Sequence, residues 1–180
     1  MELLKKPKSE LTHYLQIDYR ISSLNKITIG LNESVDELKH RNKTVGWYDG
    51  IWLLEDSEPI YGLFFISLQN YIYGSIKDRT GTLNTKNKVS FVKKYGPKDA
   101  HDRSLIELIV SLANYYKHKD DGLNDFTKEV LNHFNLNHGE DLYIRDSPIF
   151  DGLDILDTEW NLQNIVKIVS EWREEIWNYD

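Results

Sequence analysis

Between Ser9 and His40, apolar residues recur three, four or seven positions apart, and this spacing leaves few folds open to the chain. An α-helix turns through about 100° per residue, so residues with this spacing share one side of a helix. The residues are Tyr14, Ile17, Ile21, Leu24, Leu31, Val35 and Leu38. Ser9 precedes them and suits a helix N-cap. The spacing therefore predicts a long amphipathic helix over residues 9–40.

Helical signals continue along the rest of the chain. The run SEPIYGLFFISLQNYIYGSIKD is apolar nearly all round, which is typical of a central helix, and Pro59 suits its first turn. The stretch before it, TVGWYDGIWLLED, contains two Gly and is predicted to be irregular. Further helices are predicted over about 102–119, over 123–136, and over a final segment that places Leu162, Ile165, Val169, Trp172 and Ile176 on one face.

Two irregular segments separate these helices. Residues 79–101 form a long predicted loop, and loops of that length in compact domains are usually functional or disordered. Within it, Val89, Phe91 and Tyr95 indicate one short strand. Residues 139–157 form the second irregular segment. The sequence predicts an all-α protein, an up-and-down helical bundle of about five helices with long irregular loops, in a single domain over residues 1–180.

Composition excludes several classes of protein. The chain has no Cys, which excludes disulfide bonds and a thiolate-rich metal site. The segment MELLKKPKSELTHYL lacks the apolar run of a signal peptide, and no stretch approaches the ~20 apolar residues that span a membrane. We therefore expect a cytoplasmic protein without a membrane partner.

Charge is distributed unevenly along the chain. Residues 1–119 hold 18 Lys and Arg against 14 Asp and Glu, whereas residues 120–180 hold 4 against 15, and the net charge is −7. The most basic stretch, residues 86–103, has six Lys and Arg, including Lys93 and Lys94. Such a stretch is either a solvated loop or a contact for phosphate groups.

A polar stripe runs along the helix predicted over residues 102–119. With Leu105 taken as zero, three other apolar residues of this helix fall within about 40° of it and define the core side. The polar stripe lies opposite and consists of Arg103, Glu107, Ser111, Asn114 and His118. These residue types make directed hydrogen bonds, and Lys117 and Lys119 beside His118 favour an anionic ligand. We expect the polar stripe to face away from the chain's own core, toward water or another surface.

The sequence LANYYKHKDD, residues 112–121, resembles the signature of the HEPN superfamily. That signature places an Arg, a polar residue such as Asn, three further residues and then His late in a central helix. Asn114 and His118 match the polar and His positions, and Ala113 stands where the family has Arg. The predicted order of helices over residues 9–136 is similar to the family's as well.

The resemblance implies a homodimer in which two motif helices line one cleft. It also implies metal-independent RNA cleavage at a site that includes Asn114, with His118 transferring a proton and the family's Arg stabilising the phosphoryl group. Ala113 leaves that last role unfilled, because Arg103 lies about 22 Å along the helix from His118 and Lys117 lacks a bidentate fork. Two expectations stay open: a HEPN-like ribonuclease, or a relative that binds RNA or nucleotide without cleaving it, in a bacterial defence or toxin–antitoxin setting.

Either form needs substrate contacts near the motif. The candidates are Arg103, Glu107, Lys117, Lys119, Lys93 and Lys94. Residues 79–101 are expected to lie beside Asn114 and His118 and to supply phosphate contacts. The rival function is that of an acidic interaction protein, such as an immunity protein or antitoxin, which covers a basic partner with residues 140–180.

No metal or cofactor site is predicted. The spacing of His133, His138, Glu140 and Asp141 matches no metal site, and DGLDILD lacks the alternating ligands of a calcium loop. Asp157, at the end of DGLDILD, is predicted to cap a helix. Glycine loops for phosphate and a Ser nucleophile elbow are absent from the sequence.

Aromatic residues are numerous, with 16 Tyr and Trp, and most are expected in the core. Trp47, Tyr48 and Trp52 differ because they lie beside Gly46 and Gly50. We interpret these three as candidates for part of a contact surface.

Overall fold

The computed structural model describes residues 16–139 and 142–178. Over these residues the chain forms seven α-helices, a short 3₁₀ helix and no β-strand, which confirms the prediction of an all-α helical bundle. The elements are α1 (Ile21–Thr44), α2 (Gly50–Thr80), α3 (Thr85–Lys94), α4 (Leu105–His118), α5 (Asp125–His133), η3 (Ile144–Asp146), α6 (Pro148–Leu156) and α7 (Leu162–Asn178). The predicted number of about five helices is too low, because both segments expected to be irregular contain a helix.

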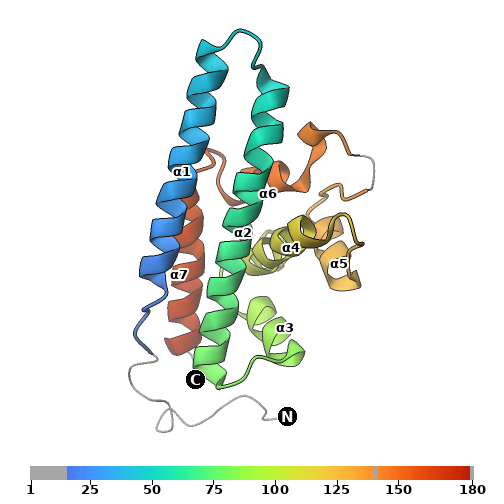
Figure 1. Cartoon of the computed structure of the whole chain (residues 1–180). Helices are drawn as coiled ribbons and strands as arrows, with labels where there is room; N and C mark the ends of the chain where they lie inside the picture. The colour runs from blue at the N-terminus through green and yellow to red at the C-terminus, as the bar shows by residue number, and fades with distance from the viewer. Residues whose placement is uncertain (1–15, 140–141, 179–180) are drawn as a thin grey trace.

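Helices α1 and α2 form a long antiparallel hairpin (Figure 1). Helices α3, α4, α6 and α7 pack against α2, and α5 packs on α4. Helix α7 lies on the side of α1, whereas α3, α4, α5 and α6 lie on the other side. The side chains of Phe64, Phe65, Leu68 and Ile72 are completely buried between these two groups. Helix α2 is therefore central, as its apolar sequence predicted.

Helix α2 begins earlier than predicted. The carboxylate of Asp49 accepts hydrogen bonds from the N–H groups of Ile51 at 2.9 Å and Trp52 at 3.3 Å, and this cap starts the helix at Gly50. Pro59 lies in the interior of the helix, on its exposed side, where water can bond the one carbonyl that loses its helical donor. The irregular stretch predicted before Pro59 is therefore wrong, apart from the turn that joins the two helices.

The segment after α2 contains α3 rather than a long loop. Asn84 caps α3 by accepting the N–H of Asn87 at 2.9 Å. Asn87 and Phe91 lie four residues apart and are both buried, which is a helical spacing. The short strand predicted at Val89, Phe91 and Tyr95 is wrong, since Val89 and Phe91 belong to α3.

The second segment expected to be irregular contains α6. Ser147 caps this helix by accepting the N–H of Ile149 at 3.4 Å, and Pro148 occupies its first turn. Asp157 ends α6 and accepts N–H groups of the following turn. Asn161, rather than Asp157 as predicted, accepts the first N–H groups of α7.

The helices predicted over residues 102–119 and 123–136 lie close to α4 and α5. The helix predicted over residues 9–40 begins later than expected, because residues 17–20 are not helical. Helix α1 begins at Ile21, and the cap predicted at Ser9 lies outside the described residues. Helices α2 and α4 approach closely at Gly62, where a Cβ atom would lie 2.3 Å from Cδ2 of Tyr116. In the two described ranges, no helix has both the length and the apolar character to cross a membrane.

Candidate functional site

The middle of the polar stripe, at Glu107 and Ser111, lies inside the molecule. Glu107 and Ser111 are only 2% and 0% exposed, because α5 packs along this side of α4. Figure 1 shows α5 directly beside α4. The prediction that the polar stripe faces away from the chain's own core is therefore wrong for Glu107 and Ser111, whereas His118, at the end of the stripe, is exposed. Periodicity identifies residues that share a face, but it does not encode the later segment that folds onto that face.

Arg103 joins the start of α4 to α5. Its Nη2 lies 3.1 Å from Oε1 of Glu107, and its Nη1 lies 2.7 Å from Oε1 of Glu129 on α5. Burial raises the pKa of Glu107 despite the opposing charge of Arg103. The hydrogen bond from Arg103 lowers the pKa of Glu129. Arg103 and Glu107, both predicted to bind substrate, are thus engaged in holding two helices together.

Asn114 is half-buried and uses both ends of its side-chain amide. Its Oδ1 accepts a hydrogen bond from Nε2 of Gln69 on α2 at 2.8 Å, and its Nδ2 donates to Oγ1 of Thr127 on α5 at 3.2 Å. The ammonium group of Lys117 donates to Oε1 of Gln69. We call these four residues the polar chain. It runs from Lys117 through Gln69 and Asn114 to Thr127 and crosses three helices.

His118 lies one turn after Asn114 on the same side of α4, and it is exposed. Ala113 is completely buried, so the position that matches Arg in the HEPN signature points into the core. An Arg at this position would bury a charge that has no partner. The motif therefore offers an exposed imidazole and an already bonded Asn, without the family's Arg.

Lys119 points toward α2. Its Nζ lies 2.8 Å from Oε2 of Glu58, whose Oε1 accepts a 2.6 Å hydrogen bond from Ser147. Burial acts to lower the pKa of Lys119, but the hydrogen bond and charge of Glu58 outweigh it and raise that pKa. Lys119, predicted to contact an anionic ligand, instead fastens the end of α4 to α2.

A cluster of lysines lies beside the polar chain. Lys117 bonds Gln69 of α2, and Lys88 lies over Tyr73, one turn further along the same helix. Burial and the positive charge of Lys88 lower the pKa of Lys117. Nζ of Lys88 lies 4.5 Å from the centre of the Tyr73 ring. Neither Lys88 nor Lys117 forms an ion pair with a carboxylate within residues 16–139 and 142–178. We call Lys88 and Lys117 the lysine cluster.

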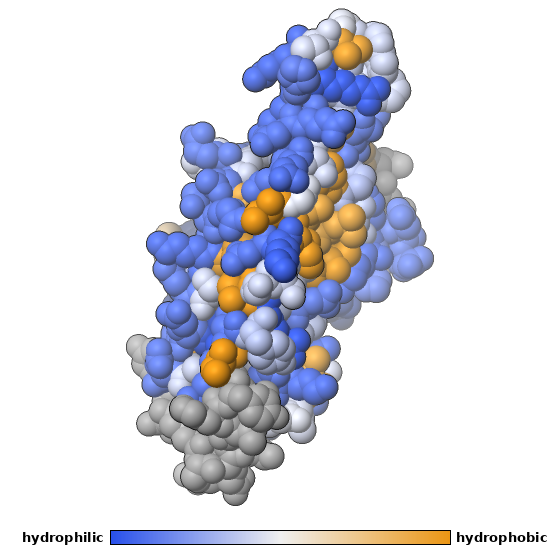
Figure 2. Space-filling model, turned by 60° about the vertical axis from the view of Figure 1, so that its left-hand side comes forward, coloured by the Kyte–Doolittle hydropathy of each residue, from blue (hydrophilic) through white to orange (hydrophobic). Residues whose placement is uncertain are grey.

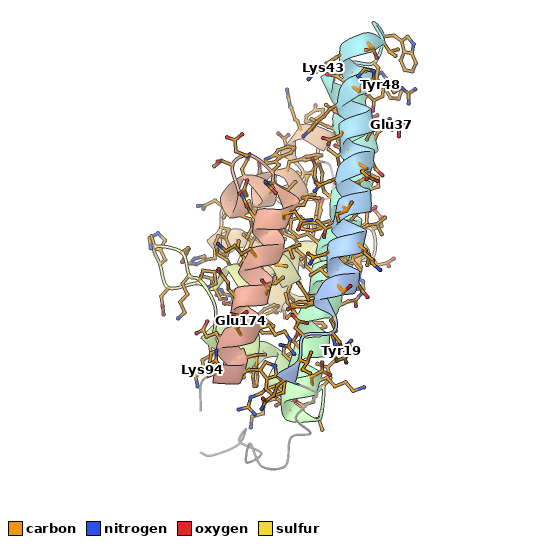
Figure 3. All side chains as sticks on the ribbon, turned by 90° about the vertical axis from the view of Figure 1, so that its left-hand side faces the viewer. Tyr19, Glu37, Lys43, Tyr48, Lys94 and Glu174 are labelled. Atoms are coloured by element: carbon orange, nitrogen blue, oxygen red, sulfur yellow. The ribbon has the colours of Figure 1, made fainter. Side chains whose placement is uncertain are left out.

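Lys93 and Lys94 are adjacent in sequence but lie on different sides of α3. Nζ of Lys93 lies 5.8 Å from the centre of the Phe126 ring on α5. Lys94 lies on the side that adjoins the C-terminal end of α7 (Figure 3). The N–H of Gly96, just after α3, donates a 2.7 Å hydrogen bond to Glu175 of α7 there. Of the two predicted lysines, Lys93 alone lies against α5.

In the part of the chain that the structure describes, no three His, Asp or Glu side chains are grouped to hold a metal ion. Nε2 of His133 lies 2.7 Å from Oδ2 of Asp99, and His138 bonds to a side chain of α5 at 3.0 Å. Glu140 and Asp141 lie outside the described residues. The ring of His133 is therefore bonded in a pair that links α5 to the turn before α4.

Two residues of the polar chain were not predicted from the sequence. Gln69 offered a signal, because it is a buried polar residue within the apolar run of α2 and such residues need hydrogen-bond partners. Thr127 offered none, because its contact with Asn114 depends on how α5 folds back onto α4.

No protein-family model, curated protein or solved structure matches the chain. We therefore infer function from the chain's own geometry. That geometry consists of the polar chain, the exposed His118 and the lysine cluster.

Proposed function

We propose that the protein is a HEPN-like binding protein that holds RNA or a nucleotide by its phosphate groups and does not cleave it. The observation that carries this proposal is the placement of two lysines against one part of α2: Lys117 bonds Gln69, and Lys88 lies over the ring of Tyr73, one turn further along. Burial and the charge of Lys88 also lower the pKa of Lys117. Two cations held together without a carboxylate repel each other, and a bound phosphate relieves that repulsion. The lysine cluster therefore suits a polyanion.

Cleavage is not part of the proposal, because the motif lacks a group that stabilises charge on a phosphoryl transition state. His118 has the side chain for proton transfer. Ala113 replaces the cation that the family places next to Asn114. The amide of Asn114 is already bonded to Gln69 and Thr127, which favours a structural role for it.

The resemblance extends the proposal to a cytoplasmic homodimer in a bacterial defence or toxin–antitoxin setting. Helix α5 covers the polar stripe around Glu107 and Ser111, so a dimer contact there requires α5 to move. A contact through the exposed end of α4, at His118, requires no such movement. We therefore place the proposed dimer contact at His118.

The proposal is tested with a fluorescein-labelled RNA of 12 nucleotides and the purified protein. We expect the fluorescence anisotropy to rise to saturation and the affinity to fall between ~50 and ~200 mM salt, because each phosphate contact releases counterions. The RNA recovered without added metal is expected to be intact on a denaturing gel. Absence of binding at low salt, or an affinity that salt does not change, contradicts the proposal.

A second candidate is an acidic interaction protein that neutralises a basic partner. The observation that favours it is at α6, where burial and the charges of Asp154 and Asp146 raise the pKa of Asp151. Three carboxylates thus crowd one another, and a cationic partner would relieve that repulsion. Replacing the RNA by a Lys-rich peptide separates the two candidates. Peptide binding that Asp151→Asn and Asp154→Asn weaken together favours the second.

A further inference from the structure

The end of the α1–α2 hairpin stands clear of the other helices (Figure 1). Glu58 holds α2 against the body of the protein through Lys119 and Ser147. From Glu58 to the start of α2 at Gly50 there are eight residues, which rise about 12 Å along the helix. The hairpin end therefore projects beyond the body of the protein and is accessible to another molecule.

Large apolar side chains are exposed at this end. Trp47, Ile51 and Trp52 are 63%, 60% and 48% exposed. The ring of Trp47 packs edge-on against Tyr48 and Trp52, with ring centres 6.0 Å and 6.3 Å away, and the Arg41 guanidinium lies over Trp47 at 5.4 Å. We call Arg41, Trp47, Ile51 and Trp52 the aromatic tip. Figure 2 shows apolar surface at the hairpin end, separated by hydrophilic surface from a larger apolar area further down.

The aromatic tip is fixed by hydrogen bonds beneath it. Tyr48 is 2% exposed, and its hydroxyl donates to Oδ2 of Asp56 at 2.7 Å. Nδ2 of Asn42 donates to the main-chain oxygen of Tyr48 at 2.8 Å. The Asp49 cap fixes the first turn of α2. A surface held in one conformation loses little conformational entropy on binding, which favours affinity.

Positive charge lies along the α1 side of the aromatic tip. Residues 38–48 include Lys39, Arg41 and Lys43, which we call the basic collar, and contain no Asp or Glu. On α2, Glu55 and Asp56 lie one turn after Ile51 and Trp52. Figure 3 shows Lys43 and Tyr48 at the hairpin end and Glu37 further down α1. The carboxylate of Asp49, the next residue, is bonded to the N-terminal amides of α2. The aromatic tip is therefore basic on its α1 side and acidic on its α2 side.

We propose that the aromatic tip docks into an apolar pocket with an acidic rim on a different protein. Trp and Arg are the residue types most enriched where protein interfaces concentrate their binding energy, and Trp47, Trp52 and Arg41 adjoin one another here. The basic collar selects an acidic rim by charge complementarity. One concavity of the chain itself is mostly polar and unsuited to the tip; it is lined by Gln16, Arg173, Glu174, Trp177 and Asn178.

This proposal is independent of RNA binding. Trp52 and Gln69 lie 17 residues apart in α2, which is about 25 Å along the helix. The aromatic tip and the lysine cluster are therefore separate surfaces, and either can be lost without the other.

The test is photo-cross-linking in the cells that naturally express the chain. p-Benzoylphenylalanine replaces Ile51 at the tip or, as the control, Ile29, which is 51% exposed on α1. We expect one discrete protein adduct from position 51 and none of that mass from position 29. Mass spectrometry of the adduct is expected to place the cross-link beside apolar and acidic residues. Reversing the collar charge with Arg41→Glu and Lys43→Glu is expected to reduce the adduct at least tenfold.

Four outcomes contradict the proposal. They are no discrete adduct from position 51, an adduct with a second copy of the chain, an adduct with lipid, and an adduct that charge reversal leaves unchanged. Circular dichroism and a melting curve of each purified variant show whether the fold is retained. The Lys26→Glu/Lys128→Glu variant, which changes the net charge equally at two other exposed lysines, is expected to leave the adduct intact.

Discussion

Nδ2 of Asn114 donates a hydrogen bond of 3.2 Å to Oγ1 of Thr127, and this bond joins the motif helix to the helix that covers it. Thr127 is completely buried and Asn114 is half-buried. The residue that matches the polar position of the HEPN signature therefore contributes to the fold, and its contribution is measurable.

Replacing Thr127 by Val keeps the shape of the side chain and removes the acceptor for Asn114. We expect the free energy of unfolding to fall by about 1–2 kcal/mol, because a donor in a partly buried place loses its partner. Urea unfolding measures this change. Thr158→Val, at an exposed position, is the control and is expected to stay within about 0.5 kcal/mol of the unsubstituted protein. Equal changes in the two variants would mean that the bond between the helices contributes nothing.

The close approach of α2 and α4 predicts opposite effects for two Gly→Ala substitutions. At Gly62 a Cβ would lie 2.3 Å from the ring of Tyr116, so Gly62→Ala is expected to cost about 1–3 kcal/mol of stability. At Gly30 nothing lies within 4 Å, so Gly30→Ala is expected to add up to about 1 kcal/mol through helix propensity. Thermal melting of both variants checks the pair. A stabilised Gly62→Ala variant is incompatible with this packing.

The most accurate predictions were for helices whose ends and buried face are determined by nearby residues in the sequence. Helix α4 follows a Ser104 cap, and α7 buries the face that its spacing predicted. The start of α2 was missed because two Gly suggested a break, whereas the Asp49 cap starts a helix there. Helix α3 was missed because the alternation of Val89 and Phe91 resembles a strand over so few residues.

The candidate site was harder to predict, because it depends on which segments cover α4. Helical geometry grouped Glu107, Ser111 and Asn114 correctly on one face, but α5 covers that face. Lys93 and Lys94 were grouped as one basic feature, whereas α3 turns them to different sides. Both errors concern tertiary contacts that a single sequence does not contain.

Lys88→Met tests the proximity of the two lysines. Burial and the charge of Lys88 lower the pKa of Lys117, so removing that charge is expected to raise the pKa of Lys117 toward its ordinary 10.5. Carbon-13 NMR of the lysine ε positions measures the titration. In the unsubstituted protein, the charged form of Lys117 lowers the free energy of unfolding at neutral pH, because its pKa in the folded state is lowered. This destabilisation is relieved as pH rises through the lowered pKa toward 10.5, so this group makes stability increase with pH over that window. Lys26→Met is the control. If the pKa of Lys117 changes equally in the Lys88→Met and Lys26→Met variants, Lys88 does not lie near Lys117.

His118→Ala tests the absence of cleavage. We expect no metal-independent cleavage of the 12-nucleotide RNA by the unsubstituted protein, because Ala113 stands where the family has Arg. The variant is expected to keep the stability of the original within about 0.5 kcal/mol, since His118 is exposed. If the original protein cleaves RNA and His118→Ala abolishes that cleavage, the motif is catalytic without its Arg and the non-cleaving proposal is wrong.

The central claim, that the lysine cluster binds phosphate groups, is tested most directly by RNA affinity and its dependence on salt in two matched double variants. Lys88→Glu/Lys117→Glu alters the cluster, and Lys26→Glu/Lys94→Glu makes the same change in net charge at lysines on α1 and on the α7 side of α3. We expect the first variant to bind the 12-nucleotide RNA at least tenfold more weakly, with a slope of log K against log salt that is smaller by about 1.4, or about 0.7 for each lost phosphate contact. The second variant is expected to bind within about threefold of the unsubstituted protein, because its lysines lie outside the site and act only through screened, long-range charge. Equal losses in the two variants, or an unchanged slope in the first, would contradict the claim.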